Sequence, residues 1–334
     1  MISLKTEINL PGFPVDLSYH QKAMMMGSCF TESIGTYLQE LLFPVEINPF
    51  GILYNPFSIA NSLDLLMEGK TFKEDDLFYA NGLWNSFYHH SRFSNPDLQQ
   101  CLTNINQKIE EAARCLKESN LLFLTFGTAW VYESLRTNEI VSNCHKLPTS
   151  EFRRYRLSPE QIKDRWIGLI SKLLSINPAL NIVFTVSPIR HLKDGAHENQ
   201  LSKASLLIAI DELSTHFGNE QIFYFPSYEI VLDELRDYRF YASDMVHLTD
   251  VAIEIIREKF SSAFIGKEDM KIASEIVKLR SALNHRPVHP EGEIYQQFID
   301  NQIEKINQMK MNYPFLNLEI ILNQFNLKKS TFNF

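Results

Sequence analysis

Residues 23–38 read AMMMGSCFTESIGTYL, and this stretch decides the fold. The apolar run at 23–26 has the length of a strand, and residues 31–38 have the pattern of an amphipathic helix. The residues between them therefore form a strand-to-helix turn. Because N–H groups and the dipole at a helix start favour negative charge, a thiolate, an alkoxide or a developing oxyanion is stabilised there. The turn predicts a nucleophile, supplied by Cys29 or by its neighbour Ser28.

A candidate general base lies more than two hundred residues later, in the segment Asp244-Met245-Val246-His247. An aspartate and a histidine at positions i and i+3 of a short turn can present both side chains to one cleft. The carboxylate then orients the imidazole, and the imidazole deprotonates the nucleophile. We therefore predict a triad in which Asp244 and His247 serve Cys29 or Ser28.

The remainder of the chain alternates short apolar runs with helical patterns, which is typical of a parallel α/β sheet. Where parallel strands end, ligands bind at the carboxyl edge of the sheet, and the candidate residues follow strand ends or lie in the loops beyond them. Strands are predicted at 23–26, 121–126, 182–186 and 222–225, and helices at 33–42, 104–117, 158–176, 203–217, 249–264 and 293–309.

Taken together, these segments resemble the GSCFA family of the SGNH (GDSL-like) hydrolase superfamily. The resemblance depends on the motif GSCFT at 27–31 and on the Asp244/His247 pair. Three further blocks lie between them: NPFGILYNP at 48–56, TFGTAWVY at 125–132 and TVSPIRH at 185–191. The resemblance implies a three-layer α/β/α fold with a flavodoxin-like parallel sheet. It also implies ester hydrolysis through a covalent acyl-enzyme, with acetyl or other short acyl groups on a carbohydrate as the leading substrates.

The family motif leaves the identity of the nucleophile open. An ungapped match to the Gly-Asp-Ser-Leu motif of the superfamily places Cys29 at the nucleophile position, and a shift of one residue places Ser28 there. By resemblance, the oxyanion hole uses the N–H groups of the nucleophile and of Gly51, together with an asparagine from a Gly-x-Asn-Asp block. That block reads Gly127-Thr128-Ala129-Trp130 here, without the asparagine. The alternative donors are Thr128, Asn55, His90 and Asn199.

Composition narrows the range of partners. The chain has 334 residues, of which 45% are hydrophobic, and its formal net charge is −8. It therefore lacks the excess of basic residues that binding to nucleic acids or anionic membranes requires. Four irregularly spaced cysteines, and no recognisable signal peptide or membrane-spanning stretch, predict a cytoplasmic protein with reduced thiols. We expect no cofactor and no metal, and a homo-oligomer is compatible with the sequence.

The sequence predicts a hydrolase-like domain at 1–267 and a C-terminal helical extension at 268–334, joined near a proline-containing linker at 284–290. An aromatic-rich insertion at about 71–95 is expected to form a lid over the site. The predicted activity is that of an esterase. Two alternatives are an O-acyltransferase acting on a sugar or another alcohol, and a non-catalytic carbohydrate-binding or scaffold protein.

Overall fold

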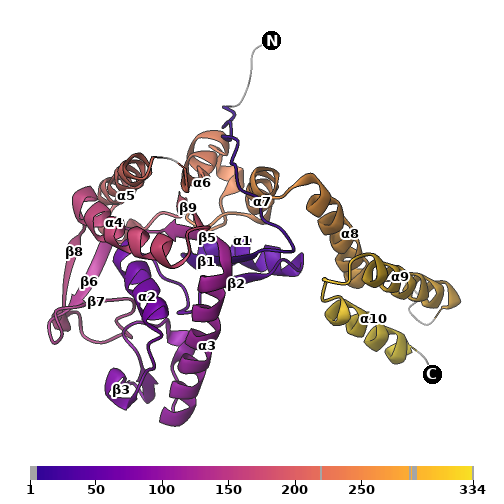
Figure 1. Cartoon of the computed structure of the whole chain (residues 1–334), viewed down its shortest axis with the longest axis horizontal. Helices are drawn as coiled ribbons and strands as arrows, with labels where there is room; N and C mark the ends of the chain where they lie inside the picture. The colour runs from indigo at the N-terminus through magenta and orange to yellow at the C-terminus, as the bar shows by residue number, and fades with distance from the viewer. Residues whose placement is uncertain (1–5, 219, 286, 288–291, 333–334) are drawn as a thin grey trace.

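The computed structural model describes residues 6–218, 220–285, 287 and 292–332. Within these residues the centre of the molecule is a five-stranded parallel sheet with the order β10-β9-β5-β1-β2 (Figure 1). Its strands are β1 (Lys22–Gly27), β2 (Val45–Ile47), β5 (Ser119–Phe126), β9 (Asn181–Val186) and β10 (Ile222–Tyr224). Counted among themselves they follow the flavodoxin-like order 2-1-3-4-5. The predicted α/β fold with a parallel sheet is therefore confirmed.

Helices cover both faces of this sheet, because successive residues of its strands point to opposite sides and both sides are apolar. On β1, Met24 and Met26 belong to one buried cluster, whereas Ala23 and Met25 belong to another. The first cluster packs against α2 (Pro56–Glu68), α3 (Leu98–Glu118), α4 (Pro159–Ile176) and α5 (Ala196–His216). The second packs against α1 (Cys29–Glu40) and α7 (Asp250–Phe264).

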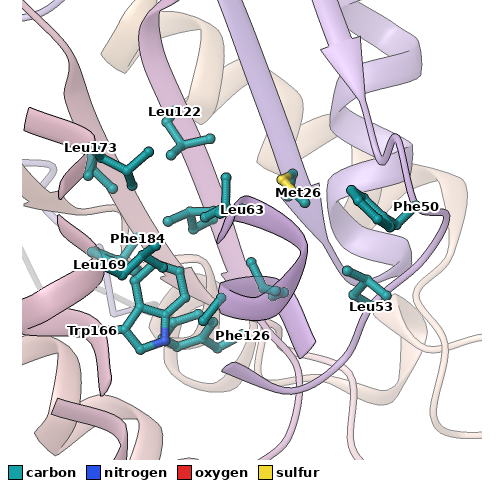
Figure 2. Close-up of a cluster of buried hydrophobic side chains, with 14 of the residues drawn as sticks. Met26, Phe50, Leu53, Leu63, Leu122, Phe126, Trp166, Leu169, Leu173 and Phe184 are labelled. Atoms are coloured by element: carbon teal, nitrogen blue, oxygen red, sulfur yellow. The ribbon is translucent and has the colours of Figure 1, made fainter. Parts of the chain in front are cut away.

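The first cluster includes Trp166 of α4, which lies beside Phe126 and Phe184 (Figure 2). Its indole ring lies 5.1 Å from the ring of Phe126 and 5.3 Å from that of Phe184, measured between ring centroids. These two phenylalanines come from adjacent strands, β5 and β9. Aromatic packing therefore anchors α4 to the strands whose carboxyl ends border the site.

The insertion at 71–95 contains a hairpin, β3 (Phe78–Ala80) paired with β4 (Leu83–Asn85), and its aromatic side chains other than the exposed Tyr79 are buried or half-buried. Phe72 is buried in the core, and Trp84 and Phe93 pack against the same cluster. The placement differs from the lid expected from the sequence. Burying aromatic rings against α3 removes more apolar surface from water than suspending them over a polar cleft.

Smaller elements complete the domain. A separate antiparallel sheet has the order β7-β6-β8 and consists of β6 (Trp130–Ser134), β7 (Ile140–Val141) and β8 (Phe152–Arg156). A short α6 (Ser227–Glu229) runs into a π-helical turn at Ile230–Glu234. Single 3₁₀ turns occur at Glu74–Asp76, Ser91–Phe93, Thr149–Glu151, Leu192–Asp194 and Tyr238–Phe240.

Three helices at the C-terminal end lie beside the sheet domain: α8 (Lys267–Asn284), α9 (Glu293–Asn312) and α10 (Glu319–Phe332) (Figure 1). The helix predicted at 293–309 corresponds to α9. The ring of Phe315, between α9 and α10, lies 4.3 Å from that of His20, and Arg280 donates a hydrogen bond to the carbonyl of Glu40. Most of the linker predicted at 284–290 lies outside the described residues.

Candidate active site

The turn between β1 and α1 requires glycine at position 27. Gly27 has φ +144°, and a Cβ atom there would lie 2.3 Å from the carbonyl oxygen of Thr125 on the neighbouring strand. Its N–H donates to Oδ1 of the buried Asn48 at 2.9 Å. Two adjacent strands can therefore approach each other closely where β1 ends, and the next residues begin the helix directly.

Ser28 and Cys29 occupy different places in this turn. Ser28 is buried and caps α1, because its Oγ accepts a hydrogen bond from the N–H of Phe30 at 3.3 Å. Cys29 is the first residue of the helix and is only partly buried. The serine hydroxyl is thus engaged in capping, whereas the thiol lies at the surface of a pocket.

Asp244 and His247 form the hydrogen-bonded pair that the sequence predicted. Nδ1 of His247 lies 2.6 Å from Oδ2 of Asp244. The other oxygen, Oδ1, accepts from the N–H groups of Val246 and His247, both at 2.9 Å. The hydrogen bond from His247, followed by these backbone N–H groups, lowers the pKa of Asp244 to about 2. The carboxylate therefore stays ionised and can hold the imidazole with Nε2 facing away from it.

Cys29 and His247 line one pocket of about 160 Å³. Apolar side chains supply most of the remaining wall. They come from α1, from the loop after β9, from the residue after His247 and from α7: Phe30, Ile34, Ile189, Leu248, Ile253 and Ile256. Ser28 is not among the lining residues. The pocket thus brings a thiol, an oriented imidazole and an apolar wall together at the carboxyl edge of the sheet.

Opposing effects act on the Cys29 thiol. Burial raises its pKa, whereas the N–H groups of Phe30 and of Cys29 itself and the positive charge of Lys203 lower it; Glu32 raises it further. Burial is the largest effect, so the pKa lies above its usual value. Cys29 is consequently a thiol at neutral pH and needs a base to become a nucleophile.

Two of the proposed oxyanion donors lie in the segment 48–56. The N–H of Gly51 donates to the carbonyl of Asn48 at 2.7 Å. Asn55 caps α2: its Oδ1 accepts from the N–H of Ser58 at 2.8 Å, and its Nδ2 donates to Oγ of Ser58 at 2.9 Å. The third candidate, His90, accepts from the N–H of Arg92 through Nδ1. In this structure these groups have partners away from the pocket.

The other donor candidates are also engaged elsewhere. The N–H groups of Gly127 and Thr128 both donate to the carbonyl of Tyr54, at 2.8 and 2.9 Å. Oγ of Thr128 lies 3.1 Å from Oγ of Ser202, and Oδ1 of Asn199 accepts from the N–H of His191 at 3.0 Å. None of the six candidates lines the pocket of Cys29 and His247. The N–H groups of Phe30 and of Cys29, at the start of α1, do interact with the thiol.

Sequence reasoning missed two buried polar residues near the site. Asn48 joins the turn to α1, since its Nδ2 donates to Glu32 at 2.9 Å while its Oδ1 accepts from Gly27. In the sequence, only the position of Asn48 in the NPFG block indicated that it has such a role. Lys203 is fully buried below the sheet edge, although a lysine in an amphipathic helix usually faces water.

His191, in one of the family blocks, lies beside these groups. Burial, followed by the charges of Lys203 and His247, lowers its pKa to about 4, so its ring is neutral at neutral pH. The ring meets that of Tyr54 edge-on, with 5.6 Å between centroids.

The described part of the chain contains no group of three or more His, Cys, Asp or Glu side chains placed to bind a metal ion. Within the same residues, no helix combines the length and the apolar character needed to cross a membrane. All four cysteines are free.

Comparison with known proteins places this site within a family. A search of curated proteins found no match. Among solved structures, the chain is similar to an acetyl xylan esterase (Est2A) from the rumen bacterium Butyrivibrio proteoclasticus, with 10% identity and a TM-score of 0.37. The similarity covers 76% of this chain and 64% of that one, so the chain spans less than two thirds of the esterase.

Two family models match the sequence itself. The model of the GSCFA family matches residues 22–260, which include both halves of the candidate triad. A second model, described as the C-terminal domain of GSCFA domain proteins, matches residues 276–328, which include α9. Because the first match alone spans more than half of the chain, the protein belongs to the GSCFA family.

Proposed function

We propose that this protein is an acyl-ester hydrolase of the SGNH type in which Cys29 is the nucleophile, His247 the general base and Asp244 the residue that orients it. One observation carries the proposal: Cys29 and His247 line the same pocket, and His247 is held by Asp244 through a hydrogen bond of 2.6 Å. The arrangement matches the roles that a nucleophile, a base and an orienting carboxylate perform in acyl transfer.

The chemistry proceeds in two halves. Nε2 of His247 takes the proton of the Cys29 thiol while Nδ1–H donates to Asp244. The thiolate attacks the ester carbonyl, and N–H groups at the start of α1 stabilise the tetrahedral oxyanion. The alcohol leaves with the proton from His247, and the acyl group stays on sulfur as a thioester. Water, deprotonated by His247, then releases the carboxylic acid and regenerates the thiol.

The pocket wall supports a short acyl group as substrate. Apolar side chains surround a space of about 160 Å³, which suits a small hydrocarbon group and excludes a long lipid chain. We propose acetyl or similarly short esters as substrates, with a carbohydrate as the alcohol.

Access of water favours hydrolysis over transfer to a second alcohol. The side chain of His247 is 62% exposed, and the hairpin at 78–85 does not line the pocket. An acyltransferase needs to exclude water from its acyl-enzyme, and this site is open.

Hydrolysis of p-nitrophenyl acetate, and of acetylated sugars, tests the proposal. We expect His247→Ala and Cys29→Ala to lose at least about a hundredfold in kcat, because each removes a group that acts in the reaction. Asp244→Asn is expected to fold normally and lose activity, since it keeps the shape but alters the tautomer control. Mass spectrometry should detect an acetyl group on Cys29.

Three results would each contradict a part of this proposal. Activity that survives His247→Ala would exclude the mechanism. Wild-type protein that hydrolyses none of these esters above the uncatalysed rate would instead favour a non-catalytic carbohydrate-binding or scaffold protein. Faster turnover of long-chain esters than of acetyl esters would exclude the short-acyl specificity.

A further inference from the structure

Lys203 is a buried cation that the proposed mechanism does not use. It lies on α5 with 1% of its surface exposed. Its Nζ donates hydrogen bonds to the carbonyls of Gly127 and Ser187, both at 2.6 Å. An ammonium group has three N–H donors and a positive charge that is costly to bury. A lysine kept in such a place has a structural or a chemical role.

The register of the sheet places these two carbonyls beside Cys29. Gly27 of β1 pairs with Thr125 of β5, so Cys29 and Gly127 each follow that pair by two residues. Phe126 of β5 pairs with Val186 of β9, which directly precedes Ser187. Adjacent strands lie about 4.8 Å apart. The carbonyls that hold Lys203 therefore belong to the residues that directly follow the first and second strands next to β1, at the edge of the sheet where Cys29 lies.

The groups around the thiol come from several elements. On α1, the N–H of Phe30 favours the thiolate and Glu32 opposes it. His247 lines the same pocket, Tyr54 interacts electrostatically with Cys29, and His191 interacts with both Lys203 and His247. Burial raises the pKa of the thiol, and among the described residues Lys203 is the side-chain cation that lowers it.

The coupling between the two groups acts in both directions. Burial lowers the pKa of Lys203 to about 7, and Cys29 raises it. At neutral pH the lysine is therefore partly charged. A charged lysine and a thiolate stabilise each other in this poorly solvated place.

We infer that Lys203 is a positioning residue whose buried ammonium group stabilises the thiolate of Cys29 while it holds the ends of β5 and β9 together. This inference rests on the proposed role of Cys29 as the nucleophile.

Alkylation of Cys29 by iodoacetamide as a function of pH tests the inference without any ester substrate. In Lys203→Met we expect the pKa of the Cys29 thiol to rise by about one unit, so that alkylation near neutral pH slows about tenfold. Lys203→Arg, which keeps the charge, should restore part of this rate. Peptide mapping reports Cys101 and Cys115 in the same samples as internal references.

Lys193→Met is the matched control. Lys193 is exposed one turn before α5 and donates to the hydroxyl of Tyr132 at 2.9 Å, so its removal should leave the titration of Cys29 unchanged. A folded Lys203→Met protein with the wild-type Cys29 titration would overturn the inference. If that variant also loses esterase activity, the lysine is structural and the proposed function still stands.

A reciprocal measurement covers the case in which Lys203 variants fail to fold. With ¹³C-labelled lysine, NMR follows the titration of Lys203 in the wild type and in Cys29→Ala, which leaves the buried lysine in place. We expect Lys203 to titrate at lower pH once the thiol is gone. Identical titration curves would refute the coupling. Coupling in a wild type without esterase activity would leave the inference intact and remove only the proposed function.

Discussion

Position 27 has no room for a side chain. Both the positive φ of +144° and the 2.3 Å approach to Thr125 exclude a Cβ atom. We expect Gly27→Ala to lower the free energy of unfolding by about 3 kcal/mol or more, from backbone strain and displacement of β5. Gly168 is the matched control, because it is exposed within α4 and a Cβ atom added there would meet no heavy atom within 4 Å. We therefore expect Gly168→Ala to raise the free energy of unfolding by about 0.5–1 kcal/mol. Urea unfolding measures both, and equal effects would contradict the argument.

His89 is a second residue whose surroundings make a measurable prediction. Its ring stacks on Phe50 with 4.7 Å between centroids, and its Nδ1 contacts Oγ of Ser86 at 2.9 Å. Burial, and then His145, lowers its pKa to about 3. The folded state therefore binds fewer protons than the unfolded state, in which histidine titrates near 6.5. Its stabilising contribution is complete above about pH 6.5 and is lost as the pH falls towards 3.

The loss amounts to about 1.4 kcal/mol per pH unit for one proton. We expect His89→Phe, which keeps an aromatic ring, to show a shallower decline of stability between pH 6 and about pH 4. His191 should preserve part of the slope, because its pKa is also lowered, to about 4. Thermal or urea unfolding across this range tests the point, and parallel pH profiles for the two proteins would count against it.

At the scale of the element, the start of α1 gives different roles to two adjacent residues, either of which the sequence allows as the nucleophile. Ser28 caps the helix and Cys29 faces the pocket. We expect Ser28→Ala to cost about 1 kcal/mol of stability and to retain activity, whereas Cys29→Ala loses activity. Asn55→Ala is the matched control, since it removes the cap of α2 away from the pocket, at a similar cost in stability. Loss of activity in Ser28→Ala alone would identify the serine as the nucleophile.

Helices and strands were predicted correctly where long apolar runs mark them. They were missed or misplaced where they depend on contacts between residues far apart in the sequence. The strands β1, β5, β9 and β10 and the helices α4 and α7 lie within a few residues of their predicted bounds. Residues Val45–Ile47 form a strand of only three residues, which becomes stable by pairing with β1, and no local pattern reveals it. The helix α5 begins at Ala196, seven residues before its predicted start, because tertiary contacts of Asn199 and Lys203 stabilise its first turns.

For the whole molecule, the described C-terminal helices share one apolar cluster with α1, α7 and the segment around Leu17. Within it, Ile276 and Leu279 of α8 lie with Ile306 of α9 and Phe325 of α10. We expect a chain ending at residue 266 to unfold cooperatively, because the sheet and its covering helices stay complete. A chain ending at residue 285 should aggregate, since α8 would expose its apolar face.

Light scattering and thermal unfolding of the two truncated chains distinguish these outcomes. A chain ending at 266 that is insoluble or lacks a cooperative transition would show that the C-terminal helices belong to the core of the sheet domain. A soluble, monomeric chain ending at 285 would show that α9 and α10 are not needed to keep the apolar face of α8 away from water.

Local chemistry was sufficient to predict the parallel sheet, the turn between β1 and α1 and the pairing of Asp244 with His247, because each depends on residues close together in sequence or on the periodicity of apolar residues. Three features depended on tertiary structure. The aromatic insertion packs into the core, Ser28 is committed to capping while Cys29 reaches the pocket, and Lys203 lies beneath the site. The reason is physical: burial, hydrogen-bond partners and the low dielectric around a charge arise only when distant segments meet at the sheet edge.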